Sequence, residues 1–217
     1  MEKKKRGRPR KNNDIQGEEY WKNRLKDDSK RDWGYGAGSW IEDYCLSIDH
    51  SHRRLIVEAL EGFNGSILEV GCNCGANLKL IQDKYPEIQL AGIDVNADVI
   101  ERAKEFLPKP IFKVASVLNI PFEDKEFEVV IADAVFMYIE DIARALTEID
   151  RVVRRGVVIV DWSDGASEKV KEFHWVRDYK ALLEALGFDV SVKKLTKEEW
   201  PSENWEKNGY IFIARRR

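Results

Sequence analysis

The feature that most constrains the fold is a regular alternation of two kinds of segment from residue 66 onward. Short apolar runs, such as residues 127–132, have the length of a strand and no polar face, as in a sheet covered on both sides. Between them lie segments such as residues 141–152, where Ile142, Ala145 and Ile149 recur at helical spacing. This alternation predicts a parallel sheet with helices on both faces.

The expected strands are residues 66–71, 88–94, 111–115, 127–132, 156–162, 188–195 and 209–214. The expected helices are residues 49–61, 76–85, 96–107, 141–152 and 174–186. Because no helical pattern separates the last two strands, we expect them to be antiparallel to each other. The sequence therefore predicts an α/β fold with a seven-stranded, mostly parallel sheet, helices on both faces, and an antiparallel pair at one edge.

Two segments precede this region. Residues 1–13 carry seven Lys or Arg and one Glu, which leaves 29 of the 36 basic and 38 of the 39 acidic residues for the rest of the chain. We expect residues 1–14 to be a disordered basic arm, and residues 15–61 to be an aromatic lid with helical parts. Residues 62–217 are expected to form the main domain.

Composition excludes several classes of protein. The apolar runs end after a few residues, whereas a membrane-spanning helix needs about 20. The basic start has no apolar segment behind it, so we expect no secretory signal. Three cysteines are an odd number and too few for a disulfide framework. We expect a cytoplasmic protein with no membrane partner.

The strand ends suggest a ligand, because parallel sheets bind ligands beyond the carboxyl ends of their strands. Gly71 allows a sharp turn after the first strand, Gly75 opens the next helix, and Asn73 tolerates a positive φ. Asp94 ends the second strand and can accept hydrogen bonds from both hydroxyls of a ribose. The pattern predicts a nucleoside site, and the dinucleotide spacing Gly-x-Gly-x-x-Gly is the alternative.

At this point the chain resembles the class I S-adenosylmethionine-dependent methyltransferases, of the type 11/12 kind. Their first motif, Glu-x-Gly-x-Gly-x-Gly, is matched at Glu69, Gly71 and Gly75 and missed at Asn73. Gly92-Ile93-Asp94 is similar to their second motif, and residues 115–130 and 133–138 resemble their third and fourth. Ser116 stands where the family usually has an Asp that binds the adenine amino group. The motifs cover about residues 62–162, and only the strand pattern covers residues 163–217.

The resemblance implies a Rossmann-like fold that binds S-adenosylmethionine and positions a nucleophile in line with its methyl group. The catalytic residues that it suggests are Asp133, Tyr138 and, at the start of a helix, His174. The cofactor-binding residues that it suggests are Glu69, Gly71, Cys72, Asn73, Gly75, Asn77, Asp94, Val95, Ser116, Val117, Asp133 and Ala134.

The aromatic segment has two interpretations. Tyr20, Trp21 and Arg24 share one helical turn. They form either a hydrophobic flap on the sheet or a lid, in which Arg24 meets the cofactor's carboxylate and the aromatic rings meet its cation.

Two short patterns resemble metal sites. Cys72-x-Cys74 lacks nearby third and fourth ligands. His50-x-His52 is followed by Arg53 and Arg54, which favours a helix start at the surface. We expect no metal.

The basic arm contains a motif that is more specific than its charge alone. Arg6-Gly7-Arg8-Pro9 resembles an AT-hook, an extended segment that binds the minor groove of DNA. A generic basic arm is the alternative, and either would bind weakly and with strong salt dependence.

Three functions compete. A methyltransferase acting on a small molecule is favoured, since the strand-four loop lacks the Asp/Asn-Pro-Pro-Tyr/Phe of amino-methylating DNA enzymes. The chain also has no Pro-Cys dipeptide, which carries the nucleophile of cytosine-C5 enzymes. A nucleic-acid methyltransferase recruited by the arm and a non-catalytic cofactor-binding protein are the alternatives. The sequence predicts neither the methyl acceptor nor the oligomeric state.

Overall fold

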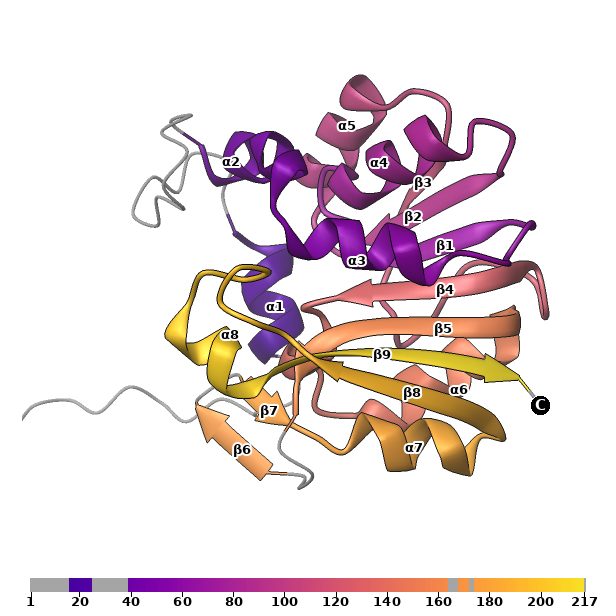
Figure 1. Ribbon diagram of the computed structural model, residues 1–217. Helices are drawn as coiled ribbons and strands as arrows, with labels where there is room; N and C mark the ends of the chain where they lie inside the picture. Colours follow the sequence, from indigo (N-terminus) through magenta and orange to yellow (C-terminus); the bar gives the residue numbers. More distant parts are fainter. Residues whose placement is uncertain (1–15, 25–38, 164–167, 172–173, 217) are drawn as a thin grey trace, which may run out of the picture.

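A computed structural model of the chain describes residues 16–24, 39–163, 168–171 and 174–216. Its centre is a seven-stranded sheet with the strand order β3-β2-β1-β4-β5-β9-β8 (Figure 1). The strands are β1 (Ile67–Val70), β2 (Leu90–Asp94), β3 (Ile111–Val114), β4 (Phe127–Asp133), β5 (Val153–Trp162), β8 (Phe188–Lys194) and β9 (Gly209–Arg216). The first five pair in parallel, and β9 pairs antiparallel with both β5 and β8. This confirms the predicted fold class, including the antiparallel edge.

The helices cover both faces of the sheet. They are α1 (Gln16–Lys22), α2 (Trp40–Leu46), α3 (His52–Ala59), α4 (Ala76–Lys84), α5 (Ala97–Phe106), α6 (Ile142–Val152), α7 (Tyr179–Ala185) and α8 (Glu203–Asn208), with 3-10 turns η1 (Ser47–Asp49) and η2 (Phe136–Tyr138). None of the helices in the described part of the chain has the length and apolar character needed to cross a membrane.

Successive residues of β4 face opposite sides of the sheet, which explains its uninterrupted apolar run. Val129 and Ile131 pack in one core with side chains of α2, α3, α4 and α5. Val130 and Ala132 pack in the other core with side chains of α6 and α7. All four residues are fully buried. The strand therefore contributes to both hydrophobic layers, as a central strand of a covered sheet must.

The expected helix 174–186 is wrong in its first third. His174–Val176 is strand β7, which pairs antiparallel with β6 (Glu168–Lys171) in a separate two-stranded sheet. Helix α7 begins only at Tyr179, where the side chain of Asp178 accepts the backbone N–H of Ala181 at 3.0 Å. The aromatic and β-branched residues before that cap favour an extended chain. His174 is therefore not at the start of a helix.

Other boundaries differ less from the prediction. The helix expected from residue 49 begins at His52, after the turn η1. The short helix α8 lies in a segment for which no element was expected. Asn96 caps α5, because its side-chain oxygen accepts the backbone N–H groups of Asp98 and Val99. Gly187 follows α7 with a φ of +84°, the left-handed conformation that glycine favours after a helix.

Candidate active site

A cavity of about 490 Å³ opens at the carboxyl ends of the parallel strands. Residues that follow β1, β2, β3 and β4 line its base, and side chains of α1, α2, α3 and the segment at Trp200–Trp205 line its sides. Helices α1, α2 and α8 lie at this edge of the sheet in Figure 1. The cavity has the size of a site for a small molecule.

The turn after β1 needs three residues with positive φ: Gly71 (+66°), Asn73 (+47°) and Gly75 (+86°). A Cβ atom on Gly71 would lie 2.4 Å from Cγ2 of Val135, so glycine is required for space as well as for conformation. Asn73 adopts the left-handed conformation with the help of its own side chain, whose oxygen accepts the backbone N–H of Cys74 at 2.7 Å. The turn therefore forms despite the missing glycine at position 73.

Asp94 is held at the end of β2 by the same turn. Its carboxylate accepts the backbone N–H of Asn73 at 3.0 Å and that of Asn96 at 3.0 Å. Burial raises the pKa of Asp94 to about 6, although these backbone donors lower it again in part. The side chain lines the cavity and can still accept hydrogen bonds from a ligand's hydroxyl groups.

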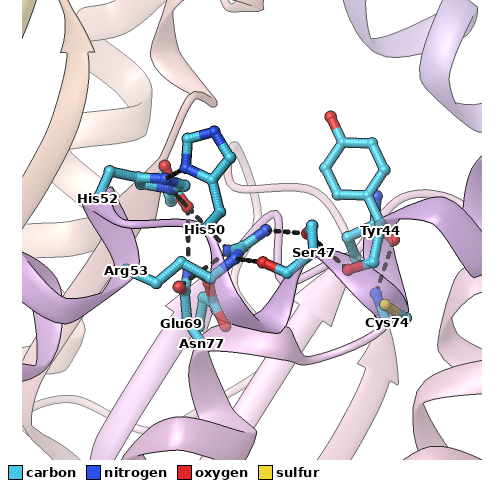
Figure 2. A network of polar contacts seen from close by, with 10 residues as sticks. Tyr44, Ser47, His50, His52, Arg53, Glu69, Cys74 and Asn77 are labelled. Carbon is cyan, nitrogen blue, oxygen red and sulfur yellow. Dashed lines mark hydrogen bonds and ion pairs between the residues drawn. The ribbon is translucent and has the colours of Figure 1, made fainter. Parts of the chain in front are cut away.

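A buried polar network surrounds Asp133, which ends β4, and Figure 2 labels its members His52, Arg53 and Asn77. Its Oδ2 accepts hydrogen bonds from His52 Nε2 at 2.9 Å, Arg53 Nη1 at 3.2 Å and Asn77 Nδ2 at 3.0 Å. Burial alone would raise the pKa of Asp133, but these three partners outweigh it and hold the pKa below its ordinary range. Asp133 is therefore a fixed negative charge, and it is better suited to hold a cation than to accept a proton.

Arg53 is the buried cation of this network, with only 6% of its surface exposed. Its Nε and Nη2 donate to the carbonyl and hydroxyl oxygens of Ser47 at 2.9 and 2.8 Å, and its Nη1 donates to Asn77 Oδ1 at 2.9 Å (Figure 2). The guanidinium thus connects η1, α4 and β4. This connection orders the wall of the cavity before any ligand binds.

Glu69 lies beside the network, in the middle of β1. Its Oε1 accepts the side-chain N–H of Asn77 at 2.7 Å. Burial raises the pKa of Glu69 to about 8, and Asn77 opposes this rise only in part. Two buried oxygens, Glu69 Oε2 and Asp133 Oδ1, have no hydrogen-bond partner within the described residues. Because unpaired buried acceptors are costly, they indicate a site for a hydrogen-bond donor of a ligand.

The prediction that His50 and His52 lie at a helix surface is wrong for His52, which is only 2% exposed. Its Nε2 faces Asp133, and its Nδ1 lies 2.6 Å from Nδ1 of His50. Burial lowers the pKa of His50 to about 4, with His52 and Arg53 adding to the effect. Burial also lowers the pKa of His52. Both rings are therefore neutral near neutral pH and act as weak bases.

Aromatic rings form much of the cavity wall. The ring of Trp200 stacks on that of Trp205, with centroids 3.6 Å apart and an interplanar angle of 7°. It also lies over His52, with centroids 4.0 Å apart, and Trp162 meets Trp205 edge to face. Together with Tyr138 these residues line an apolar, flat-sided space.

Helix α1 docks on the strand ends through its backbone and one glycine. Asn96 Nδ2 donates to the carbonyls of Trp21 and Arg24 at 2.7 and 3.0 Å. A Cβ on Gly17 would lie 2.2 Å from the carbonyl oxygen of Tyr138, so only glycine permits this approach. The guanidinium of Arg24 is buried against the rings of Trp40 and Trp21, at 4.2 and 5.2 Å from their centroids. It does not line the cavity.

Most of the residues predicted for the cofactor or for catalysis line this one cavity. They are Trp21, Glu69, Gly71, Cys72, Asn73, Asn77, Asp94, Val95, Val117, Asp133, Ala134 and Tyr138. Five predicted residues do not line it, namely Tyr20, Arg24, Gly75, Ser116 and His174. Of these, Gly75 packs against Phe112, and His174 stacks on Trp162 with centroids 5.3 Å apart. The AT-hook residues Arg6, Gly7, Arg8 and Pro9 lie outside the described residues.

His52, Arg53 and Trp200 line the cavity although they were not predicted as site residues. A signal for two of them existed in helix α3. His52 and Arg53 precede the buried Ile56 and Val57 by four positions each, so the helical period places both on the inward face. Trp200 gave no such signal, because it lies in a loop whose position depends on the tertiary fold.

Comparison with known proteins agrees with this geometry. A family model described as "Methyltransferase domain" matches residues 68–161, and a model described as "AT hook motif" matches residues 3–15. These matches agree with the resemblance to the class I S-adenosylmethionine-dependent methyltransferases that the motifs indicated. The match spans β1 to β5 and therefore contains the turn at Gly71, the acid at Asp94 and the loop at Asp133.

Relatives and solved structures cover different shares of the chain. A trans-aconitate 2-methyltransferase of Rhodopseudomonas palustris is 30% identical over 48% of this chain and 41% of the relative. A demethylmenaquinone methyltransferase of Thermotoga maritima is 28% identical over 51% of this chain and 48% of the relative. The chain thus spans less than half the length of these relatives. The structure of magnesium protoporphyrin IX methyltransferase from Synechocystis, solved with bound S-adenosylmethionine, covers 97% of this chain and all of its own length at a TM-score of 0.69 and 13% identity. It supports the fold alone.

Proposed function

We propose that this domain binds S-adenosylmethionine in the cavity and transfers its methyl group to a small molecule. The observation that carries the proposal is the pair of unpartnered buried oxygens, Glu69 Oε2 and Asp133 Oδ1, beside the turn at Gly71 and the acid at Asp94. The cofactor carries an ammonium group and a sulfonium, so it brings both donors and positive charge to a site that has an excess of carboxylates.

The order of the strands supports one direction for the bound cofactor. In the sheet, β4 and β1 lie on one side of β2, and β3 lies on the other. In the proposed complex, Asp133 on β4 and Glu69 on β1 would hold the ammonium group, and Asp94 on β2 would accept the ribose hydroxyls. The base would then lie toward β3.

When bound, the cofactor supplies an activated methyl carbon, so the protein's residues mainly position the acceptor and exclude water. The rings of Trp162, Trp200 and Trp205 fit the flat apolar body of an acceptor. The network offers a fixed charge at Asp133 and weak, neutral bases at His50 and His52. These groups suit an acceptor that is nucleophilic without help from a strong base. Of the other residues suggested for catalysis, Tyr138 is better placed than His174, because it lines the cavity.

The proposal is tested by incubating the protein with methyl-labelled S-adenosylmethionine and separate pools of small metabolites, DNA and RNA. We expect label in a small-molecule fraction, and clearly less label with the Asp94→Ala variant at a cofactor concentration near the wild-type dissociation constant. Label that enters only nucleic acid would refute the assignment of the acceptor. The cofactor assignment is refuted if NAD raises the melting temperature of the protein whereas S-adenosylmethionine and S-adenosylhomocysteine do not.

We also propose that the N-terminal arm binds AT-rich DNA, because residues 3–15 match the AT hook motif. A matched pair of variants separates this from generic charge attraction. Changing both Arg6 and Arg8 to Lys keeps the charge but removes the planar guanidinium groups. An AT hook would then lose its preference for AT-rich over GC-rich duplexes, measured by fluorescence anisotropy at fixed salt. Unchanged preference would contradict the motif's role.

A further inference from the structure

At the end of the cavity next to β3, one acidic side chain comes from a helix and not from the sheet. Val95, Ala115 and Val117 line this end with apolar groups. Glu18, from helix α1, also lines it, and its Oε2 accepts the hydroxyl of Ser116 at 2.9 Å. Ser116 is the second residue after β3, next to Ala115, whose N–H donates to the Asp94 carbonyl at 2.9 Å. Glu18 therefore lies beside the strand end that neighbours the proposed ribose site.

In the orientation proposed for S-adenosylmethionine, the purine base would lie at this end of the cavity. With the ammonium group at Asp133 and Glu69 and the ribose at Asp94, the base extends from β2 toward β3. Its faces meet the apolar side chains, and its exocyclic amino group needs an acceptor in a partly dehydrated site. Glu18 is the carboxylate that the described residues offer there, apart from Asp94 itself.

We infer that Glu18 accepts a hydrogen bond from the amino group of adenine and so makes the site specific for adenosine over 6-oxopurine nucleosides. The inference rests on the proposed function. Ser116 acts as a positioning residue, because its Oγ donates to Glu18 while it accepts the N–H of Leu118 at 3.0 Å. Its hydroxyl thus directs the carboxylate without lining the cavity itself.

This arrangement makes base recognition depend on a docked α1. The helix is held by the two hydrogen bonds from Asn96 and by the close approach of Gly17 to Tyr138. Undocking α1 would remove Glu18 from the base and leave Asp94 in place. Selectivity for the base and affinity for the ribose are therefore separable properties.

The test compares S-adenosylhomocysteine with S-inosylhomocysteine, whose 6-oxo group is an acceptor, by calorimetry on the full chain. The wild type is expected to prefer the adenosine compound by about 10- to 100-fold, since a carboxylate facing a carbonyl oxygen loses a charge-assisted bond. Glu18→Gln should lose most of this preference, because an amide can also donate to the 6-oxo group. Glu19→Gln, on the exposed side of the same helix, should keep it.

Two results would overturn the inference without touching the proposed function: an unchanged preference in Glu18→Gln, or an equal loss in Glu19→Gln. Ser116→Ala should reduce the preference for the adenosine compound, whereas Ser116→Thr, which keeps the hydroxyl, should retain it. Failure of the wild type to bind S-adenosylhomocysteine at all would instead refute the proposed function. The ratio of the two affinities is the decisive quantity, because a purely structural defect would weaken both ligands alike.

Discussion

Changing Glu69 to Gln should stabilise the ligand-free protein, and the gain should grow with pH. Burial raises the pKa of Glu69 from 4.5 to about 8, so the folded state keeps a proton that the unfolded chain has lost. The stability of the wild type therefore falls as the pH rises from about 4.5 to about 8. The free energy of unfolding of the variant minus that of the wild type should be roughly 2 to 3 kcal/mol larger at about pH 7 than at about pH 5. At about pH 9 it should be at most roughly 4 kcal/mol larger than at about pH 5.

The assay is urea denaturation of both proteins at a series of pH values, with the difference in the free energy of unfolding plotted against pH. A Gln side chain can still accept the N–H of Asn77 with its carbonyl oxygen, so the fold should persist. Glu58→Gln, on the exposed side of α3, is the matched control and should show no comparable slope. A difference for Glu69→Gln that does not vary between about pH 5 and about pH 9 would refute the account of the buried carboxyl.

Three further predictions concern the cavity walls. Asp94→Ala should lower the affinity for S-adenosylhomocysteine at least about 10-fold in calorimetry, because the ribose loses a charged acceptor, and an unchanged dissociation constant would contradict the ribose assignment. Gly71→Ala combines a φ of +66° with a Cβ 2.4 Å from Val135, so it should lower the free energy of unfolding by about 2 to 4 kcal/mol. Gly187→Ala, with a φ of +84° and no atom within 4 Å, should lower it by only about 1 kcal/mol. Equal losses in urea denaturation would refute the steric argument. Gly17→Ala should weaken cofactor binding with little change in the melting temperature, because it undocks α1 and leaves the sheet intact; unchanged affinity would show that the docked helix is not needed.

The sheet could be predicted from the sequence because its strands are defined by local patterns. The apolar run of β4 and the helical period of α6 each indicate one element without reference to the rest of the chain. The segment from His174 could not be assigned in the same way. Its three strand residues are followed at once by a capped helix, and only the pairing with β6 distinguishes the two states.

The strand-end residues at the bottom of the candidate site could be predicted from the sequence, whereas the side chains of its wall could not. Gly71 and Asp94 stand at fixed places after strands, so their proximity follows from the parallel topology. His52, Arg53 and Asp133 come together only because α3 packs beside the end of β4, at a sequence separation of about 80 residues. Isolated polar residues at a helix start are usually exposed, and the inward period of α3 was the one local clue to the contrary.

The most direct test of the central claim is a crystal structure of the protein soaked with S-adenosylhomocysteine. The account predicts ribose oxygens within hydrogen-bond distance of Asp94 and the ammonium group on the free oxygens of Asp133 and Glu69. Nucleoside density elsewhere on the molecule, or a cavity that accepts the pyrophosphate of a dinucleotide at the Gly71 turn instead, would contradict it.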